Sequence, residues 1–122
     1  MKGTHLLVDF GGVRNIDALK NLGVLQEVQR DVAKACKLTV VDESGYQFEP
    51  HGATSVLVLS ESHFSIHSWW EEAEAHADIF CCSDKFDATL AVALLKTQLG
   101  AETANWVVIE RPLKSESSCP GR

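Results

Sequence analysis

The sequence has no apolar run approaching the ~18 residues of a membrane-spanning helix, so we expect no transmembrane segment and no membrane partner. Its first residues lack the long apolar stretch of a secretory signal peptide, and we therefore expect a cytoplasmic protein. Basic residues are few, because 11 Lys and Arg stand against 17 Asp and Glu and leave a net charge of −6. Nucleic-acid-binding domains carry a basic patch or stripe, so we expect no nucleic-acid partner.

The cysteines also lack a metal-binding pattern. Cys36, Cys81, Cys82 and Cys119 contain no CxxC pair, which argues against a structural zinc site. Cys81 and Cys82 are neighbours, and neighbours on a strand point to opposite faces, so they cannot easily bridge each other. We expect most of these side chains to be buried, reduced thiols.

The composition is that of a soluble globular protein. The 122 residues are 45% hydrophobic and 23% charged, with both signs of charge interspersed along the chain. A chain of this length forms one domain and buries about two-thirds of its unfolded surface, so it needs no disulfide or metal to hold a core. We therefore expect a single domain over residues 1–122.

Apolar periodicity predicts two helices. Apolar residues recur at every third or fourth position across residues 16–35, which predicts one amphipathic helix of about five turns. Asn15 is a suitable N-cap for this helix, and the pattern ends near Lys37. The second helix is predicted at residues 86–99, where Gly100 stops it.

The remaining pattern predicts an antiparallel sheet. Strands are predicted at residues 4–10, 38–41, 45–48, 54–59, 63–69, 76–82 and 104–110. An Asp-Glu-Ser-Gly turn is predicted at residues 42–45, and a flexible polar tail at residues 111–122. Strands linked by hairpins between two amphipathic helices predict an α+β two-layer sandwich, with an antiparallel β-sheet and two helices packed on one face.

Residues 59–71 concentrate hydroxyl, imidazole and carboxylate groups between two hydrophobic strands. His63 and His67 could be metal ligands on a helix, but on a strand they lie about 13 Å apart, too far to hold one ion. We therefore expect no metal. Ser62 could be a hydrolase nucleophile, but it lacks a GxSxG elbow, and nothing in the sequence specifies a carboxylate to orient a base.

The run LSESHFSIH at residues 59–67 closely resembles the self-processing segment of bacterial and archaeal S-adenosylmethionine decarboxylase proenzymes. Other features follow in the order typical of this family. They are HLLVDF at residues 5–10, FxPxG at residues 48–52 and DIFxC at residues 78–82. The resemblance covers roughly residues 3–110, and the first motif is long enough to be specific.

The resemblance implies that the chain cuts itself between Glu61 and Ser62 into chains 1–61 and 62–122. The Ser62 hydroxyl would attack the Glu61 carbonyl and convert the amide to an ester, and elimination would then leave dehydroalanine. Hydrolysis of this group releases ammonia and leaves a pyruvoyl group in place of Ser62. The pyruvoyl ketone would form a Schiff base with the substrate amine and act as the electron sink, without pyridoxal phosphate or a metal.

The resemblance also assigns roles to five other residues. His67 is the processing base, and Thr54 assists processing at a position where the family commonly has serine. Cys82 is the proton donor to the substrate carbon, and a thiol suits this step because its ordinary pKa of about 8.5 lies near operating pH. Phe48 matches an aromatic residue that stacks on adenine, and Glu71 matches a carboxylate that binds the ribose hydroxyls.

The segment after His67 departs from the family pattern. Family members usually continue HTWPEYGY, whereas residues 67–74 read HSWWEEAE. The added carboxylates would suit a substrate with a distal cation, so L-ornithine or L-arginine is the alternative substrate. Because Phe48 and Glu71 are retained, S-adenosylmethionine decarboxylation for spermidine and polyamine biosynthesis is favoured. A non-catalytic relative that binds a ligand without processing itself is a further alternative. The SESH motif at residues 60–63 argues against it, because nothing in the fold alone requires that run of residues.

Strand geometry predicts a dimer. Ser62 and His67 are five residues apart, which corresponds to roughly 16 Å along a regular strand. A general base must come within about 3 Å of its proton, directly or through one water. A two-fold interface could bring each Ser62 to the partner's base. The resemblance implies the same homodimer, with Ser62 and Cys82 from one protomer and Thr54 and His67 from the other.

Overall fold

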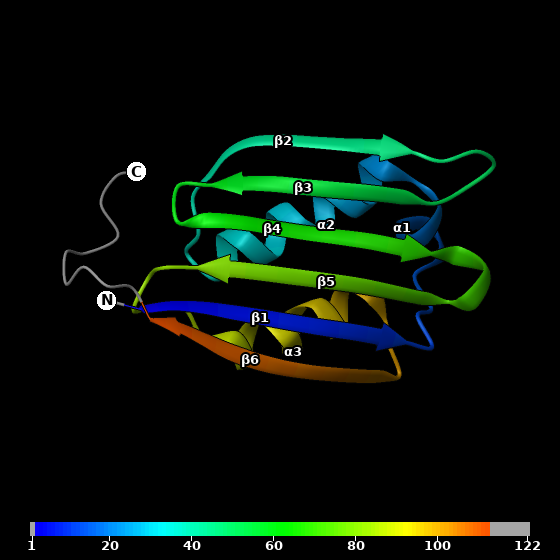
Figure 1. Cartoon of the computed structure of the whole chain (residues 1–122). Helices are drawn as coiled ribbons and strands as arrows, with labels where there is room; N and C mark the ends of the chain where they lie inside the picture. Colours follow the sequence, from blue (N-terminus) through cyan, green and yellow to red (C-terminus); the bar gives the residue numbers. More distant parts are fainter. Residues whose placement is uncertain (1, 113–122) are drawn as a thin grey trace.

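The computed structural model describes residues 2–112, which form an antiparallel sheet with helices on one face (Figure 1). The elements are β1 (Lys2–Gly11), α1 (Ile16–Lys20), α2 (Leu22–Ala35), β2 (Val40–Gln47), β3 (Ala53–Leu59), β4 (Ser62–Trp69), the 3₁₀ turn η1 (Trp70–Glu72), β5 (Glu74–Cys81), α3 (Ala88–Leu99) and β6 (Thr103–Pro112). The strand order is β2-β3-β4-β5-β1-β6, and every neighbouring pair is antiparallel. The predicted α+β two-layer sandwich is confirmed.

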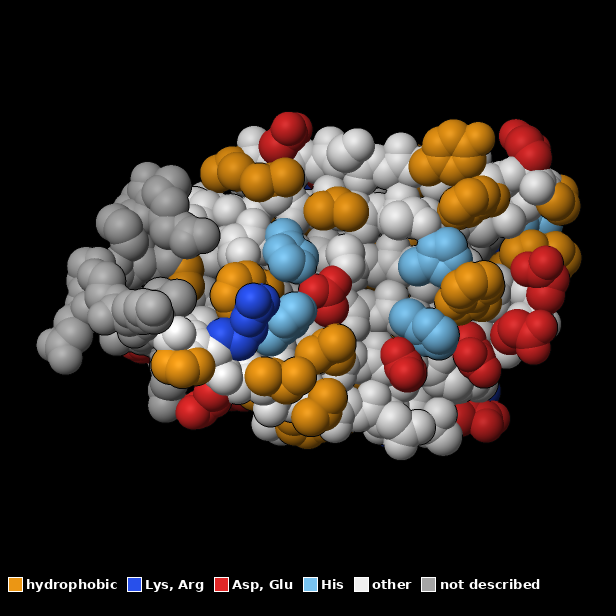
Figure 2. Space-filling view, viewed as in Figure 1, with side chains coloured by type: hydrophobic (Ala, Val, Ile, Leu, Met, Phe, Trp, Pro, Cys, Tyr) orange, Lys and Arg blue, Asp and Glu red, His pale blue; other side chains and the backbone are white. Residues whose placement is uncertain are grey.

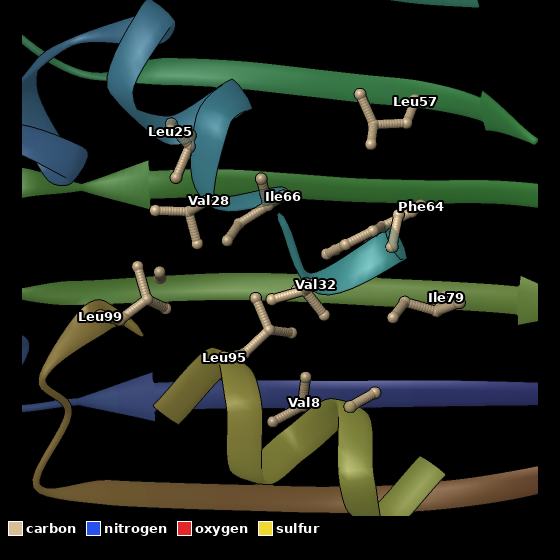
Figure 3. Packing of buried hydrophobic residues seen from close by; sticks show 14 of the residues in the cluster. Val8, Leu25, Val28, Val32, Leu57, Phe64, Ile66, Ile79, Leu95 and Leu99 are labelled. Carbon is tan, nitrogen blue, oxygen red and sulfur yellow. The ribbon is translucent and has the colours of Figure 1, made fainter. Parts of the chain in front are cut away.

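The hydrophobic core lies between the sheet and the helices α2 and α3 (Figure 3). Successive strand residues point to opposite faces, so every second residue of β3 and β5, and of β4 from Phe64 to Ser68, is buried. Phe64 and Ile66 of β4 are almost completely buried, and each large apolar side chain buried in this way contributes about 1.5–3 kcal/mol. The alternate residues of the same strands lie on the face without helices, which we call the open face.

The prediction of one long first helix is wrong, because Asn21 separates α1 from α2. Asn21 has an extended backbone, with φ −118° and ψ 122°. The next backbone N–H, that of Leu22, donates to Gln47 Oε1 at 2.7 Å, so a side chain from β2 satisfies the start of α2. The predicted cap is confirmed, since Asn15 accepts from the Ala18 N–H. No helix in the described part of the chain is long and apolar enough to cross a membrane.

The predicted turn at residues 42–45 is also wrong, because β2 runs through it with one register shift and pairs with β3 along its length. Gly45 does not form a turn; its lack of a side chain lets Leu22 pack closely against β2. A Cβ there would lie 2.5 Å from the Leu22 side chain, and a strand glycine often marks such a close approach. At the other end of the chain, β6 continues to Pro112, so the predicted tail is wrong for residues 111–112. The rest of that tail lies outside the described residues.

Candidate active site

The open face carries two separate groups of histidine side chains (Figure 2). The register of the strands places these groups in two rows across the sheet. One row joins His5 of β1, Phe80 of β5 and His63 of β4. The other row runs through Asp9, His76, His67 and Thr54, from β1 to β3. Ionisable side chains therefore lie near both ends of β4.

The predicted cleavage bond lies where a tight hairpin enters β4. Leu59 and Ser62 are register partners, so Ser60 and Glu61 alone form the connection between β3 and β4. Ser62 has φ +152°, a backbone conformation that residues other than glycine rarely adopt. Such a conformation costs about 1–3 kcal/mol and persists only where the surrounding structure holds it. The predicted scissile bond is thus followed by a strained residue.

Contacts from both sides hold this hairpin. The Ser60 N–H donates to the Thr39 carbonyl at 3.0 Å, and the Thr39 N–H donates to Glu61 Oε1 at 3.1 Å. On the other side, the Cys82 N–H donates to the Glu61 carbonyl at 3.2 Å, and Cys82 Sγ lies 3.1 Å from the same oxygen. The carbonyl that Ser62 would attack is therefore bound by Cys82.

The described cysteines differ in state. Cys36 and Cys81 are buried free thiols, as expected from the sequence, and burial is the largest cause that raises the pKa of each. Cys82 is also buried, but it is disulfide-bonded. Proton donation requires the thiol, so turnover that depends on Cys82 should require a reductant.

His67 lies near the far end of β4 with Thr54 beside it. The Thr54 Oγ1 and His67 Nδ1 atoms are 2.5 Å apart across the β3–β4 pair. Burial is the largest cause that lowers the pKa of His67, and the neighbouring His76 imidazole lowers it further. A lowered pKa keeps the imidazole neutral at more acidic pH, which is the form that a general base requires.

A cavity of about 450 Å³ opens next to His67. Its lining consists of Phe48, Glu49, Pro50, His51, Gly52, His67, Ser68, Trp69, Trp70 and Glu71. The Phe48 ring packs at an angle against the His67 ring, with centroids 5.7 Å apart. The volume lies within the range of small-molecule sites, and the lining combines aromatic faces with a few polar groups. The predicted substrate residues Phe48 and Glu71 therefore share one cavity with His67.

Within one chain, the predicted site residues form two groups. Glu61, Ser62 and Cys82 meet at the β3–β4 hairpin. Phe48, His67 and Glu71 instead line the cavity, and Thr54 contacts His67 from β3. Both groups belong to β4 or its neighbours, but Ser62 and His67 stand five strand residues apart, or roughly 16 Å. The structure does not bring Ser62 and His67 together within one protomer.

A third cluster on the open face was missed in the sequence. His5 Nε2 and His63 Nε2 lie 2.7 and 2.9 Å from Asp78 Oδ2, and the Ser65 hydroxyl donates to Asp78 Oδ1. The donor atoms of His5, His63 and Asp78 lie within 4.8 Å of one another, and this set of ligand types could hold a metal ion. Strand alternation could have placed His63 and Ser65 on one face, but only the sheet order brings in His5 from β1.

Asp78 is expected to stabilise the fold through this cluster. Burial alone would raise the pKa of Asp78, but hydrogen bonds from Ser65, His5 and His63 outweigh it and hold the pKa below its ordinary value. The carboxylate therefore stabilises the fold above the ordinary aspartate pKa, and this contribution is lost as pH falls through the lower folded-state pKa. Asp78→Ala should cost about 1–3 kcal/mol at neutral pH, measured by urea unfolding at fixed protein concentration.

The matched control for this prediction is Asp31→Ala, which removes an exposed aspartate from α2. It should leave the free energy of unfolding nearly unchanged. The difference between wild type and Asp78→Ala should shrink in acid. An equal loss in both variants, or a difference that does not depend on pH, would contradict the stabilising role of the cluster.

Comparison with known proteins bears directly on this site. The family model described as S-adenosylmethionine decarboxylase matches residues 4–112. The chain belongs to the S-adenosylmethionine decarboxylase family. Among its relatives is the S-adenosylmethionine decarboxylase proenzyme of Aquifex aeolicus (strain VF5), 37% identical over 116 residues, which are 95% of this chain and 85% of the relative.

Two further proenzymes of the same name support membership of the decarboxylase family. The one from Symbiobacterium thermophilum is 39% identical over 89% of this chain and 82% of the relative. The one from Clostridium botulinum (strain Loch Maree / Type A3) is 39% identical over 80% of this chain and 83% of the relative. The crystal structure of the adenosylmethionine decarboxylase from Aquifex aeolicus matches with a TM-score of 0.84 and 36% identity over 96% of both chains. The resemblance first noted in residues 59–67 is confirmed across the fold.

Proposed function

We propose that this chain is a self-processing decarboxylase that converts its own Ser62 into a pyruvoyl group and decarboxylates S-adenosylmethionine for polyamine biosynthesis in the cytoplasm. The observation that carries the proposal is the geometry of the Glu61–Ser62 bond. Ser62 has φ +152°, and the Glu61 carbonyl accepts a hydrogen bond from the Cys82 N–H. Together with family membership, this geometry favours cleavage at this bond.

The first step of self-cleavage uses groups that the hairpin already holds. The Ser62 Oγ attacks the Glu61 carbonyl carbon, and the C–N bond breaks as the acyl group moves to oxygen. The Cys82 N–H can stabilise the negative charge that develops on the Glu61 oxygen. Loss of the Ser62 α-proton to a base then expels the Glu61 carboxylate. One water replaces the released ammonia, so the two fragments together weigh the precursor plus one water minus one ammonia.

A pyruvoyl group at position 62 fits the residues around it. When present, its ketone supplies the electron sink that decarboxylation of an amino acid requires. Cys82 Sγ lies next to the Glu61 carbonyl, at the bond that becomes the new chain end. As a reduced thiol, Cys82 can deliver a proton to the substrate carbon after carbon dioxide leaves.

The cavity next to His67 suits a nucleoside with a positive charge. Phe48, Trp69 and Trp70 offer aromatic faces for stacking on adenine and for contact with a sulfonium cation. Glu71 is exposed and lines the same cavity, where its carboxylate can accept hydrogen bonds from ribose hydroxyls. This combination favours S-adenosylmethionine over a substrate without an aromatic base.

A homodimer completes the site in this proposal. The cleavage hairpin and the His67 cavity lie roughly 16 Å apart in one chain, so a second copy must bring His67 and Thr54 to Ser62. The open face suits a second copy, because it exposes Leu7, Val107 and Ile109 on the neighbouring strands β1 and β6 (Figure 2). The second copy therefore contributes residues to each site.

The substrate proposal is tested with purified, cleaved protein in reductant. We expect labelled carbon dioxide to be released from carboxyl-labelled S-adenosylmethionine, whereas ornithine and arginine labelled in the same way should release none. Borohydride reduction with each substrate should trap a covalent adduct on the 62–122 fragment only with S-adenosylmethionine. Turnover of ornithine or arginine without turnover of S-adenosylmethionine would overturn the substrate while leaving the pyruvoyl chemistry in place.

A further inference from the structure

Trp69, His76 and Glu74 form a chain of contacts that begins at His67. The Trp69 and His67 rings are packed with centroids 4.3 Å apart. The Trp69 indole Nε1–H donates to His76 Nδ1 at 3.2 Å. His76 Nε2 lies 3.4 Å from Glu74 Oε1. The chain thus runs from β4 to β5 on the open face.

The indole fixes the protonation state of His76 in this arrangement. An indole N–H can only donate, so His76 Nδ1 must accept and cannot carry a proton. The ring proton then resides on Nε2, on the side of the Glu74 carboxylate. Protonation of Nδ1 would remove the acceptor and release the indole.

The surroundings of His76 come from four elements. His67 of β4 and Asp9 of β1 are its register partners on the two sides. Glu74 of β5 is the charged group nearest Nε2, and Asn105 of β6 is the partner of Asp9 in the same row. Two carboxylates and one imidazole therefore face His76. Its side chain is exposed, so it can be replaced without opening the core.

We propose that His76 is a positioning residue for the processing base. By accepting the indole hydrogen bond it holds Trp69 against one side of the His67 imidazole, while Thr54 contacts that imidazole at Nδ1. The inference rests on the proposed function, in which His67 is the base. Without His76, the exposed Trp69 loses its hydrogen bond to β5 and can turn away from His67, which loosens the imidazole.

His76 also acts on His67 through charge. The two imidazoles face each other across the β4–β5 pair. In the state in which His76 is protonated, and the indole hydrogen bond is therefore absent, its positive charge lowers the pKa of His67. A variant without an ionisable group at position 76 should therefore raise the pKa of His67. Because cleavage needs neutral His67, the acidic limb of the pH–rate profile for self-cleavage should then move to higher pH.

Two replacements of His76 separate these effects. His76→Leu keeps bulk but removes the acceptor, whereas His76→Asn places an amide oxygen where Nδ1 stood. Self-cleavage of freshly translated full-length chain is followed on denaturing gels across pH. His76→Leu should slow cleavage about 10-fold, the scale of a slightly misplaced catalytic group. His76→Asn should retain close to the wild-type maximum rate, with the acidic limb displaced upward.

Trp69→Phe tests the same contact from the other side, since it keeps a ring but loses the N–H. It should slow cleavage about as much as His76→Leu, and the double variant should be no slower than either single one. Asn105→Leu is the matched control. It removes a polar side chain from the same row on β6, three strands from β4, and should cleave at the wild-type rate.

The outcomes separate this inference from the proposed function. If wild type cleaves and His76→Leu cleaves equally fast with an unchanged pH profile, the positioning role is overturned while the proposed function stands. If wild type stays in one piece, or His67→Ala cleaves at the wild-type rate, the assignment of His67 as the base fails first. Slow cleavage in His76→Asn equal to that in His76→Leu would also overturn the hydrogen-bond role.

Discussion

Replacing Ser62 with alanine is expected to leave a folded chain that stays in one piece and releases no carbon dioxide. Alanine has neither the hydroxyl that attacks Glu61 nor the oxygen that must leave, so no pyruvoyl group can form. Ser62 is half-buried, and no described hydrogen bond of its side chain supports the fold. Intact mass spectrometry should show a single full-length chain, and the assay with labelled S-adenosylmethionine should give background counts.

Ser60→Ala is the control for this prediction. Ser60 belongs to the same hairpin and is exposed, and its backbone N–H rather than its side chain makes the contact to Thr39. This variant should therefore cleave and turn over substrate like wild type. Cleavage in Ser62→Ala would place the cofactor at another residue. A full-length mass for wild type would leave a chain that binds without processing.

Mixed dimers are expected to recover activity from two inactive chains. Ser62→Ala lacks the cofactor precursor, and His67→Ala lacks the processing base, so each homodimer should stay uncut. In a mixed dimer, one site carries both defects and the other carries neither. The two chains are co-expressed with different tags, and the mixed dimers are purified through both tags. In these dimers the one chain that carries Ser62 should be cleaved, so each mixed dimer should show about half the cleavage of a wild-type dimer.

The control pairs two residues that the proposal places in one protomer. Ser62→Ala co-expressed with Cys82→Ala gives no site with both residues intact, so full turnover should not return under reducing conditions. Thermal denaturation should show that each variant folds. If purified mixed dimers of Ser62→Ala with His67→Ala stay uncut, Ser62 and His67 act within one chain and the composite site is wrong.

The local pattern predicted most of the fold because alternation and helical period follow directly from side-chain direction. β3 and β4 were predicted almost to the residue, since their buried faces alternate without interruption. The errors arose where a distant contact replaced a local signal. Gln47 satisfies the start of α2 after the break at Asn21, and Leu22 uses the space at Gly45. Neither contact can be read from neighbouring residues.

The candidate site shows the same division. Residues 59–67 alone indicated the family, and the resemblance to that family placed the proposed cleavage bond between Glu61 and Ser62. Other features of the site depend on how strands far apart in sequence pair. These are the strained backbone at Ser62, the hydrogen bond from the Cys82 N–H to the Glu61 carbonyl, and the contact between Thr54 and His67.

By itself the sequence therefore determined most of the elements, their faces and the serine proposed to react, which are set by residues close together along the chain. Only the tertiary structure decided which side chains meet across the strands. It joined His5 and His63 to Asp78, and His76 to Trp69, through the strand order of the sheet. Strand order is fixed by the packing of the whole sheet against α2 and α3, and no single segment carries that information.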